Sequence, residues 1–278
     1  MKEQKNTITC ITSASNPRIK QVIQLQKKRK EREETGLFTA EGIRLFEEIP
    51  AERLEQVFVS ESFLEREDAD AILKKAEGIE LVSVKDSVFV SMCDTRTPQG
   101  ILAVVRRKDW SLDEILSLSE TPFFMMTENL QDPGNLGTIL RAGEGAGITG
   151  LIMSRDTVDI YNPKVIRSTM GSVFRVPFFY TDDIFKTAQE LKNRGIRLFA
   201  AHLGGKNNYE QEDYKAYTNE GNEKSDNNIF RRIGRDGVFV YLCFSEIFDL
   251  YICNRINENV GSSCHQSVTQ KRRQFGIG

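Results

Sequence analysis

The stretch that decides the fold of this chain is Glu128-Asn129-Leu130-Gln131-Asp132-Pro133-Gly134-Asn135-Leu136-Gly137-Thr138-Ile139-Leu140-Arg141-Ala142, continued by Gly143-Glu144-Gly145-Ala146-Gly147. An apolar run ends just before this stretch, and a strand-like run follows at residues 151–153. Between them, a Pro-Gly-Asn turn opens a helix with one apolar face, formed by Leu136, Ile139, Leu140 and Gly143. The pattern predicts a strand–helix–strand unit, with Asn135 at the mouth of the helix and Arg141 further along it.

The glycines after this helix invite comparison with a nucleotide-binding loop. Residues 145–150 read Gly-Ala-Gly-Ile-Thr-Gly, which is formally Gly-x-Gly-x-x-Gly. The phosphate-binding mechanism needs a strand before these glycines and a helix after them. Here a helix ends and a strand begins, so we interpret the glycines as a helix stop. A nucleotide-dependent oxidoreductase is excluded on the same ground.

A second informative stretch, residues 159–178, reads DIYNPKVIRSTMGSVFRVPF. Asn162 followed by Pro163 predicts a helix that Asn162 caps. The small residues 168–171 fit a tight connection between helix and strand. The next expected strand, near residues 197–201, runs into Ala201, His202, Leu203 and Gly204, at the edge where open α/β sheets bind ligands.

The amino-terminal part also alternates between helix-like and strand-like segments. Residues 19–49 have a helical pattern that Gly36 interrupts. Strands are expected at residues 56–59, 80–84 and 101–105, with a helix near residues 70–76. A linking helix capped by Ser111 follows, which places a domain boundary near residues 107–118. We therefore expect two α/β domains, residues 1–107 and 118–278.

Composition limits the classes of function. The net charge is −2, so affinity for nucleic acid must come from local clusters of Lys and Arg. The five cysteines are scattered without a Cys-x-x-Cys pair, which argues against a metal site and for a reducing compartment. No apolar stretch reaches spanning length and no signal-like leader is evident, so we expect a cytoplasmic protein without a membrane partner.

One basic cluster stands out at residues 27–32, which read KKRKER. Such a run is usually a solvated helix face. The alternative is that Lys27, Lys28 and Arg29 grip RNA phosphates, as basic clusters of RNA-binding modules do.

The two informative stretches together resemble the signature motifs of the SpoU/TrmH family of RNA ribose 2′-O-methyltransferases. The first is Asn135-x-Gly137-x-x-x-Arg141 after the Pro-Gly turn, and the second is residues 159–178. Residues 15–20, 36–42 and 97–101 are similar to the family's substrate-binding domain, so the resemblance covers roughly residues 12–205.

The resemblance implies a small α/β RNA-binding domain followed by a SPOUT-type α/β methyltransferase domain with a trefoil knot. It implies S-adenosylmethionine as cofactor, RNA as substrate, with rRNA favoured over tRNA, and a homodimer. Arg141 and Asn135 are the implied catalytic residues, and residues 201–204 the implied wall of the cofactor pocket. The resemblance also implies that residues 168–171 lie beside the cofactor cleft, with Arg167 and Arg175 near RNA phosphate. Without the family, a capping Asn135 and a solvated Arg141 would explain both residues.

The resemblance ends near residue 205. The family's Gly-Asn-Glu-Gly-x-Gly loop and its Glu-Ser-Leu-Asn signature do not appear, and residues 219–223 match only a piece of the first. Either the domain has diverged or the reading frame shifts near residues 205–230, and we favour the frame shift. The domain is then native-like only to about residue 205, and its knot is incomplete. The alternative function is a non-catalytic RNA-binding protein on the same scaffold.

Overall fold

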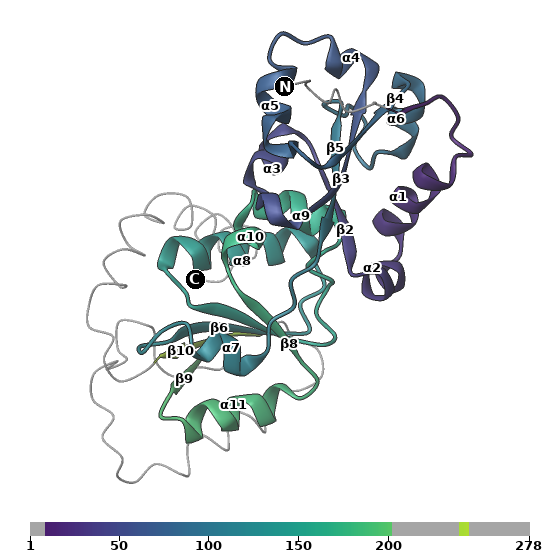
Figure 1. Cartoon of the computed structure of the whole chain (residues 1–278). Coiled ribbons are helices and arrows are strands. Elements are labelled where there is room, and N and C mark those ends of the chain that lie inside the picture. The colour runs from purple at the N-terminus through teal and green to yellow at the C-terminus, as the bar shows by residue number, and fades with distance from the viewer. Residues whose placement is uncertain (1–8, 202–238, 245–278) are drawn as a thin grey trace, which may run out of the picture. The chain divides into compact units, whose positions relative to one another are not determined.

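The computed structural model describes residues 9–201 and 239–244, which form two compact units (Figure 1). Unit 1 comprises the described part of Met1–Asp109 together with Asp132–Thr138 and Val158–Arg175. Unit 2 comprises Trp110–Gln131, Ile139–Thr157 and the described part of Val176–Gly278. The units thus interleave along the chain, and the boundary expected near residues 107–118 stays a prediction.

Unit 1 is built on a five-stranded mixed sheet with the strand order β1-β4-β3-β5-β2. β1, β4 and β3 are parallel, whereas β5 is antiparallel to both β3 and β2. Its elements in chain order are β1 (Thr9–Ile11), α1 (Pro17–Lys27), α2 (Arg29–Thr35), β2 (Leu37–Glu41), α3 (Ile43–Glu48), η1 (Ala51–Arg53), β3 (Leu54–Ser60), α4 (Glu61–Leu64), α5 (Ala69–Leu73), η2 (Lys74–Ala76), β4 (Glu80–Val84), α6 (Asp86–Met92), β5 (Ile101–Arg106), α9 (Pro163–Thr169) and α10 (Ser172–Arg175).

Helices pack on both faces of this sheet (Figure 1). On one face, apolar residues of α1 and α6 form a core with sheet residues such as Phe58, Val82 and Leu102. On the other face, Phe38 of β2 packs against the rings of Tyr161 and Phe174, with centroid distances of 4.5 and 6.2 Å. Because neighbouring strand residues point to opposite faces, β2 contributes side chains to the packing on both faces of the sheet.

The helix expected over residues 19–49 is wrong at residues 37–41, whereas α1, α2 and α3 are helical within that range. α1 ends at Lys27, Lys28 adopts an extended conformation, and α2 ends at Thr35, followed by Gly36, whose φ of 68° favours glycine. Residues Leu37–Glu41 then form strand β2, because antiparallel pairing with β5 buries Phe38 and Ala40. Tertiary pairing outweighs the local helical pattern here.

Unit 2 is built on a second five-stranded sheet with the order β8-β7-β6-β10-β9. β6, β7 and β8 are parallel, whereas β10 is antiparallel to β6 and to β9. The elements are α7 (Leu112–Leu116), β6 (Phe123–Glu128), α8 (Pro133–Ala146), β7 (Gly150–Ser154), β8 (Phe178–Thr181), α11 (Ile184–Asn193), β9 (Arg197–Ala201) and β10 (Phe239–Phe244). Residues 133–138 of α8 belong to unit 1, and residues 139–146 belong to unit 2.

The core of unit 2 lies between this sheet and helices α7 and α11. Ile115, Ile184 and Leu191 pack against Phe124 and Met126 of β6. Ser111 caps α7 as predicted, within a complete capping box with Glu114.

Strand β10 was not anticipated. All six of its residues pair with β6 on one side, and five of them pair with β9 on the other. The remaining residues after 201 lie outside the described part of the chain. Within the described part, no helix has both the length and the apolar character needed to cross a membrane.

Candidate active site

The first turn of α8 is held by Asp132. The Asn135 backbone N–H donates to Oδ1 of Asp132 at 2.7 Å, and the Leu136 N–H donates to the backbone carbonyl oxygen of Asp132 at 3.1 Å. Pro133 occupies the first helical position, where no N–H is needed. Asp132 is therefore the capping residue, which leaves the side chain of Asn135 exposed in the third helical position. An acid directly before Pro-Gly is a capping signal that the sequence already contained.

The glycine of Asn-x-Gly packs against α9. A Cβ built on Gly137 would lie 2.0 Å from Oγ of Ser168 and 2.7 Å from its backbone carbonyl carbon. The Ser168 hydroxyl also lies 3.0 Å from the carbonyl oxygen of Pro133, to which it donates. The two signature motifs therefore meet within unit 1, and Gly137 is needed because no side chain fits between the helices.

Arg141 lies two turns along α8 from its start and is exposed. Leu136 and Leu140 are fully buried, as the apolar pattern predicted. Among the residues that the structure describes, the Arg141 side chain finds no hydrogen-bond or ion-pair partner. On this continuous helix, Arg141 is displaced from Asn135 by about 9 Å along the axis. The guanidinium is thus a cation whose charge no described residue neutralises.

The loops after β6 and β7 are joined at the carboxyl edge of the unit 2 sheet. Asn129 follows β6 with a positive φ of 50°, and its N–H donates to Oγ of Ser154 at 2.9 Å. Gln131 donates to the carbonyl oxygen of Asp156 at 2.5 Å. Thr127, close to the end of β6, is fully buried, and its Oγ1 finds no hydrogen-bond partner among the described residues.

The predicted cofactor residues begin at this same edge. Ala201 is the last residue of β9, and its backbone pairs with Val240 of β10. Val240 pairs on its other side with Thr127, so β10 lies between Ala201 and the end of β6. His202, Leu203 and Gly204 lie outside the described residues, and their predicted role stays a prediction.

Helix α9 carries the second signature. Asn162 caps it by accepting from the Lys164 N–H at 2.9 Å, and Pro163 follows, as predicted. Arg167 donates through Nη2 to Oδ2 of Asp94 at 2.7 Å, while its Nη1 is buried without a partner among the described groups. Asp94 could not be recognised as this partner from local sequence signals.

A left-handed turn separates α9 from α10. Met170 has a φ of 49° with 49% of its surface exposed, and Gly171 follows with a φ of 95°. A Cβ on Gly171 would contact the Glu48 side chain at 2.7 Å, so both the backbone conformation and the space require glycine. Arg175 at the end of α10 forms an ion pair with Glu48. Both arginines predicted to lie near phosphate therefore have a carboxylate partner.

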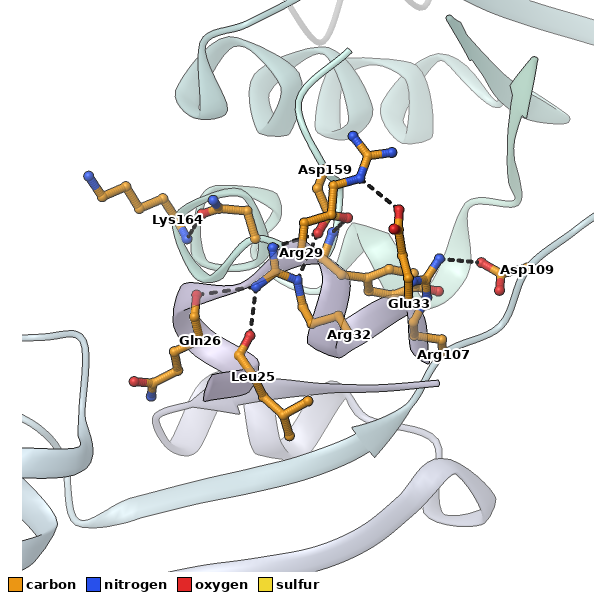
Figure 2. A network of polar contacts seen from close by, with 11 residues as sticks. Leu25, Gln26, Arg29, Arg32, Glu33, Arg107, Asp109, Asp159 and Lys164 are labelled. Atoms are coloured by element: carbon orange, nitrogen blue, oxygen red, sulfur yellow. Dashed lines mark hydrogen bonds and ion pairs between the residues drawn. The ribbon is translucent and has the colours of Figure 1, made fainter. Parts of the chain in front are cut away.

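The basic run divides into exposed and buried members. Lys27 and Lys28 are exposed at the junction of α1 and α2. Arg29 forms an ion pair with Glu33 at 2.8 Å. Arg32 is only 2% exposed and pairs with Asp159 at 2.7 Å (Figure 2). The expectation of a uniformly solvated face is wrong at Arg32, because a partner 127 residues away buries it.

Cysteine and metal chemistry add nothing to the site as described. Cys10 and Cys93 are free thiols. Burial raises the pKa of the Cys93 thiol, and the nearby Glu41 and Asp94 carboxylates raise it further. No group of three potential metal ligands occurs within residues 9–201 and 239–244.

Comparison with known proteins identifies the class. Residues 122–227 match the SpoU rRNA methylase family, and residues 16–103 match the MRM3-like substrate-binding domain. The chain therefore belongs to the SpoU/TrmH family, as the two motifs predicted. The first match extends beyond residue 205 and includes residues 219–223.

Two relatives and one solved structure illustrate the family. The chain is 30% identical over 198 residues to the "uncharacterized tRNA/rRNA methyltransferase slr1673" of Synechocystis, covering 69% of this chain and 70% of the relative. It is 34% identical to the mitochondrial rRNA methyltransferase 3A of Danio rerio, covering 62% of this chain but only 41% of that relative. The crystal structure of an RNA 2′-O ribose methyltransferase superposes with a TM-score of 0.54 at 29% identity, covering 66% of this chain and 70% of that one.

Proposed function

We propose that this protein transfers a methyl group from S-adenosylmethionine to a ribose 2′-oxygen in RNA, with rRNA as the favoured substrate. Family membership supports the reaction, and the names of the matched family and of the mitochondrial relative support rRNA. The observation that carries the proposal is Arg141, an exposed guanidinium without a described carboxylate partner on the signature helix.

Arg141 suits electrostatic work better than proton abstraction. A guanidinium stays protonated in proteins, so it is a poor general base. Negative charge develops on the 2′-oxygen as its hydroxyl proton passes to a base, for which we propose an RNA phosphate, and a fixed cation stabilises that charge until the oxygen takes the methyl group. An exposed side chain also remains accessible to an RNA strand. Asn135, exposed in the first turn of the same helix, is proposed to position the reacting groups.

The described residues fit the cofactor at the carboxyl edge of the unit 2 sheet. Open α/β sheets bind ligands at this edge, and the buried Thr127 hydroxyl there is without a partner among the described residues. We propose that Thr127 and the backbone of Ala201 belong to the pocket, together with residues 202–204. S-adenosylmethionine supplies a methyl group activated by the positive charge on its sulfur.

Unit 1 supplies the RNA-binding part of the proposal. Lys27 and Lys28 are exposed and carry no described ion pair, so they are available for phosphate. Arg167 and Arg175 can contribute only by sharing or leaving their carboxylate partners. Arg29 is similarly engaged by Glu33.

Assembly and compartment complete the proposal. The family resemblance supports a homodimer, which light scattering of the purified chain would test. The two free thiols fit a reducing compartment such as the cytoplasm. Imaging of a tagged chain would test that location.

The decisive test compares Arg141→Ala with wild type in a methyl-transfer assay. The substrate is rRNA from cells that lack the gene, with radiolabelled S-adenosylmethionine. We expect kcat to fall about 100- to 1,000-fold, the usual cost of removing an oxyanion-stabilising group. RNA affinity should change much less, because other cations remain.

The matched control is Arg194→Ala. Arg194 is an exposed arginine of unit 2 that follows α11 at the opposite edge of the sheet, and its ion pairs with Asp113 and Glu190 are weak surface pairs. Equal turnover of Arg141→Ala and wild type would refute the assigned role. Absence of cofactor binding by the wild-type chain in calorimetry would instead favour the non-catalytic RNA-binding alternative.

A further inference from the structure

A buried ion pair in unit 1 joins helices α1 and α2 to the second signature (Figure 2). Nε and Nη2 of Arg32 both lie 2.7 Å from Oδ2 of Asp159. The two side chains are 3% and 9% exposed. An ion pair buried this deeply requires good geometry and additional hydrogen bonds, because both charges have lost their water.

The additional hydrogen bonds join the ion pair to two helices, α1 through Arg32 and α9 through Asp159. On one side, Nη1 of Arg32 donates to the carbonyl oxygens of Leu25 and Gln26, at 2.6 and 3.2 Å. These carbonyls belong to the last turn of α1, directly before the exposed Lys27 and Lys28. Arg32 therefore fixes the backbone of the α1–α2 junction that presents the lysines.

On the other side, the pair fixes the entrance to α9. Oδ1 of Asp159 accepts from the Tyr161 N–H at 3.0 Å, and the Asn162 N–H donates to the Asp159 carbonyl oxygen at 2.9 Å. Asn162 is the cap of α9. The position of Asp159 thus sets where α9 begins.

The chain of contacts continues from α9 to α8. The Ser168 hydroxyl shares its proton between the Pro133 carbonyl oxygen of α8 at 3.0 Å and the Val165 carbonyl oxygen of its own helix at 2.8 Å, and its side chain fills the space beside Gly137. Every contact from Lys28 to Gly137 lies within unit 1. Contiguous packed and hydrogen-bonded groups of this kind are the physical route by which one segment constrains another.

We propose that Arg32 is a positioning residue for the methyl transfer proposed above. Through Asp159 it holds the start of α9, and through Ser168 it holds the first turn of α8, which carries Asn135. Through the Leu25 and Gln26 carbonyls, Arg32 also links the starts of α8 and α9 to the α1–α2 junction, which is proposed to bind RNA. The inference rests on the proposed function, so its first test requires no catalysis.

That test is hydrogen–deuterium exchange of the full chain carrying Arg32→Lys. A lysine keeps the charge but cannot reproduce contacts made by three guanidinium nitrogens. We expect amides of residues 134–138 and 162–170 to exchange roughly tenfold faster or more, while β3 stays unchanged. Asp159→Asn, nearly isosteric, should give the same pattern and serves if Arg32→Lys does not fold.

The matched control is Arg66→Lys. Arg66 also pairs with one carboxylate at 2.7 Å, that of Asp68, but both side chains are about half exposed at 45% and 53%. It should leave exchange unchanged. Unaltered exchange of residues 134–138 in Arg32→Lys, or a uniform increase across unit 1 that includes β3, would overturn the inference.

A second readout separates positioning from simple stabilisation. If wild type methylates rRNA, Arg32→Lys should lower kcat roughly tenfold or more, a larger change than the rise in KM for RNA that comes from the loosened α1–α2 junction. The apolar replacement Arg32→Met with Asp159→Leu can restore stability but not this geometry, so kcat should stay low. Full recovery of kcat in that double variant would overturn the positioning role. An inactive wild type contradicts only the proposed function.

Discussion

Replacement of Gly137 by alanine provides a sharp test of the contact between the two signatures. In a helix interior, alanine is favoured over glycine by about 1 kcal/mol. Against this gain stands the added Cβ, 2.0 Å from Oγ and 2.7 Å from the backbone carbon of Ser168. A rotamer change can move the hydroxyl but not the backbone, so overpacking should cost about 3 kcal/mol. The net expectation is destabilisation by about 2 kcal/mol.

Gly145→Ala is the matched control on the same helix. Nothing lies within 4 Å of a Cβ built there, so only the helix preference remains. Because Gly145 lies in the last turn, we expect a gain of about 0.5 kcal/mol.

Urea unfolding followed by circular dichroism measures both variants. With a slope of about 2 kcal/mol per molar, the midpoint of Gly137→Ala should fall by about 1 M, and that of Gly145→Ala should rise by about 0.2 M. A midpoint for Gly137→Ala equal to or above that of Gly145→Ala would refute the close packing of α8 on α9 at Gly137.

Two further predictions concern buried ionisable groups. Tyr161→Phe removes a hydroxyl that donates to the Lys108 carbonyl and accepts from its N–H, both at 2.9 Å, so stability should fall by about 1–2 kcal/mol. Burial raises the pKa of Tyr161, so the native state holds this proton more tightly, and the free energy of unfolding falls as pH rises above the unfolded pKa of 10.0. Between about pH 8 and pH 11, the urea midpoint should therefore fall less in Tyr161→Phe than in wild type. An equal fall in the two proteins would contradict this. Cys93, whose thiol pKa is raised by burial, should be alkylated by iodoacetamide far more slowly than the exposed Cys10; peptide mass spectrometry would measure both, and equal rates would show that Cys93 is accessible.

Local signals in the sequence determined much of the secondary structure. Asn162-Pro163 and Ser111 predicted where two helices begin, because capping depends on a few adjacent residues. The apolar spacing on α8 identified Leu136 and Leu140 as buried. The spacing of Asn135, Gly137 and Arg141 was sufficient to indicate the family.

Tertiary structure alone decided the features that depend on distant partners. Strand β2 replaced a predicted helix because β5, about 60 residues later in the chain, offers its backbone for pairing. The same holds for β10, whose direction follows from β6 and β9. The sequence predicted Arg32 to be a solvated cation like its neighbours. In the fold, Arg32 is buried in an ion pair with Asp159, which lies 127 residues later in the sequence. Periodicity and capping are local properties, whereas the burial of a charge depends on which remote group can neutralise it.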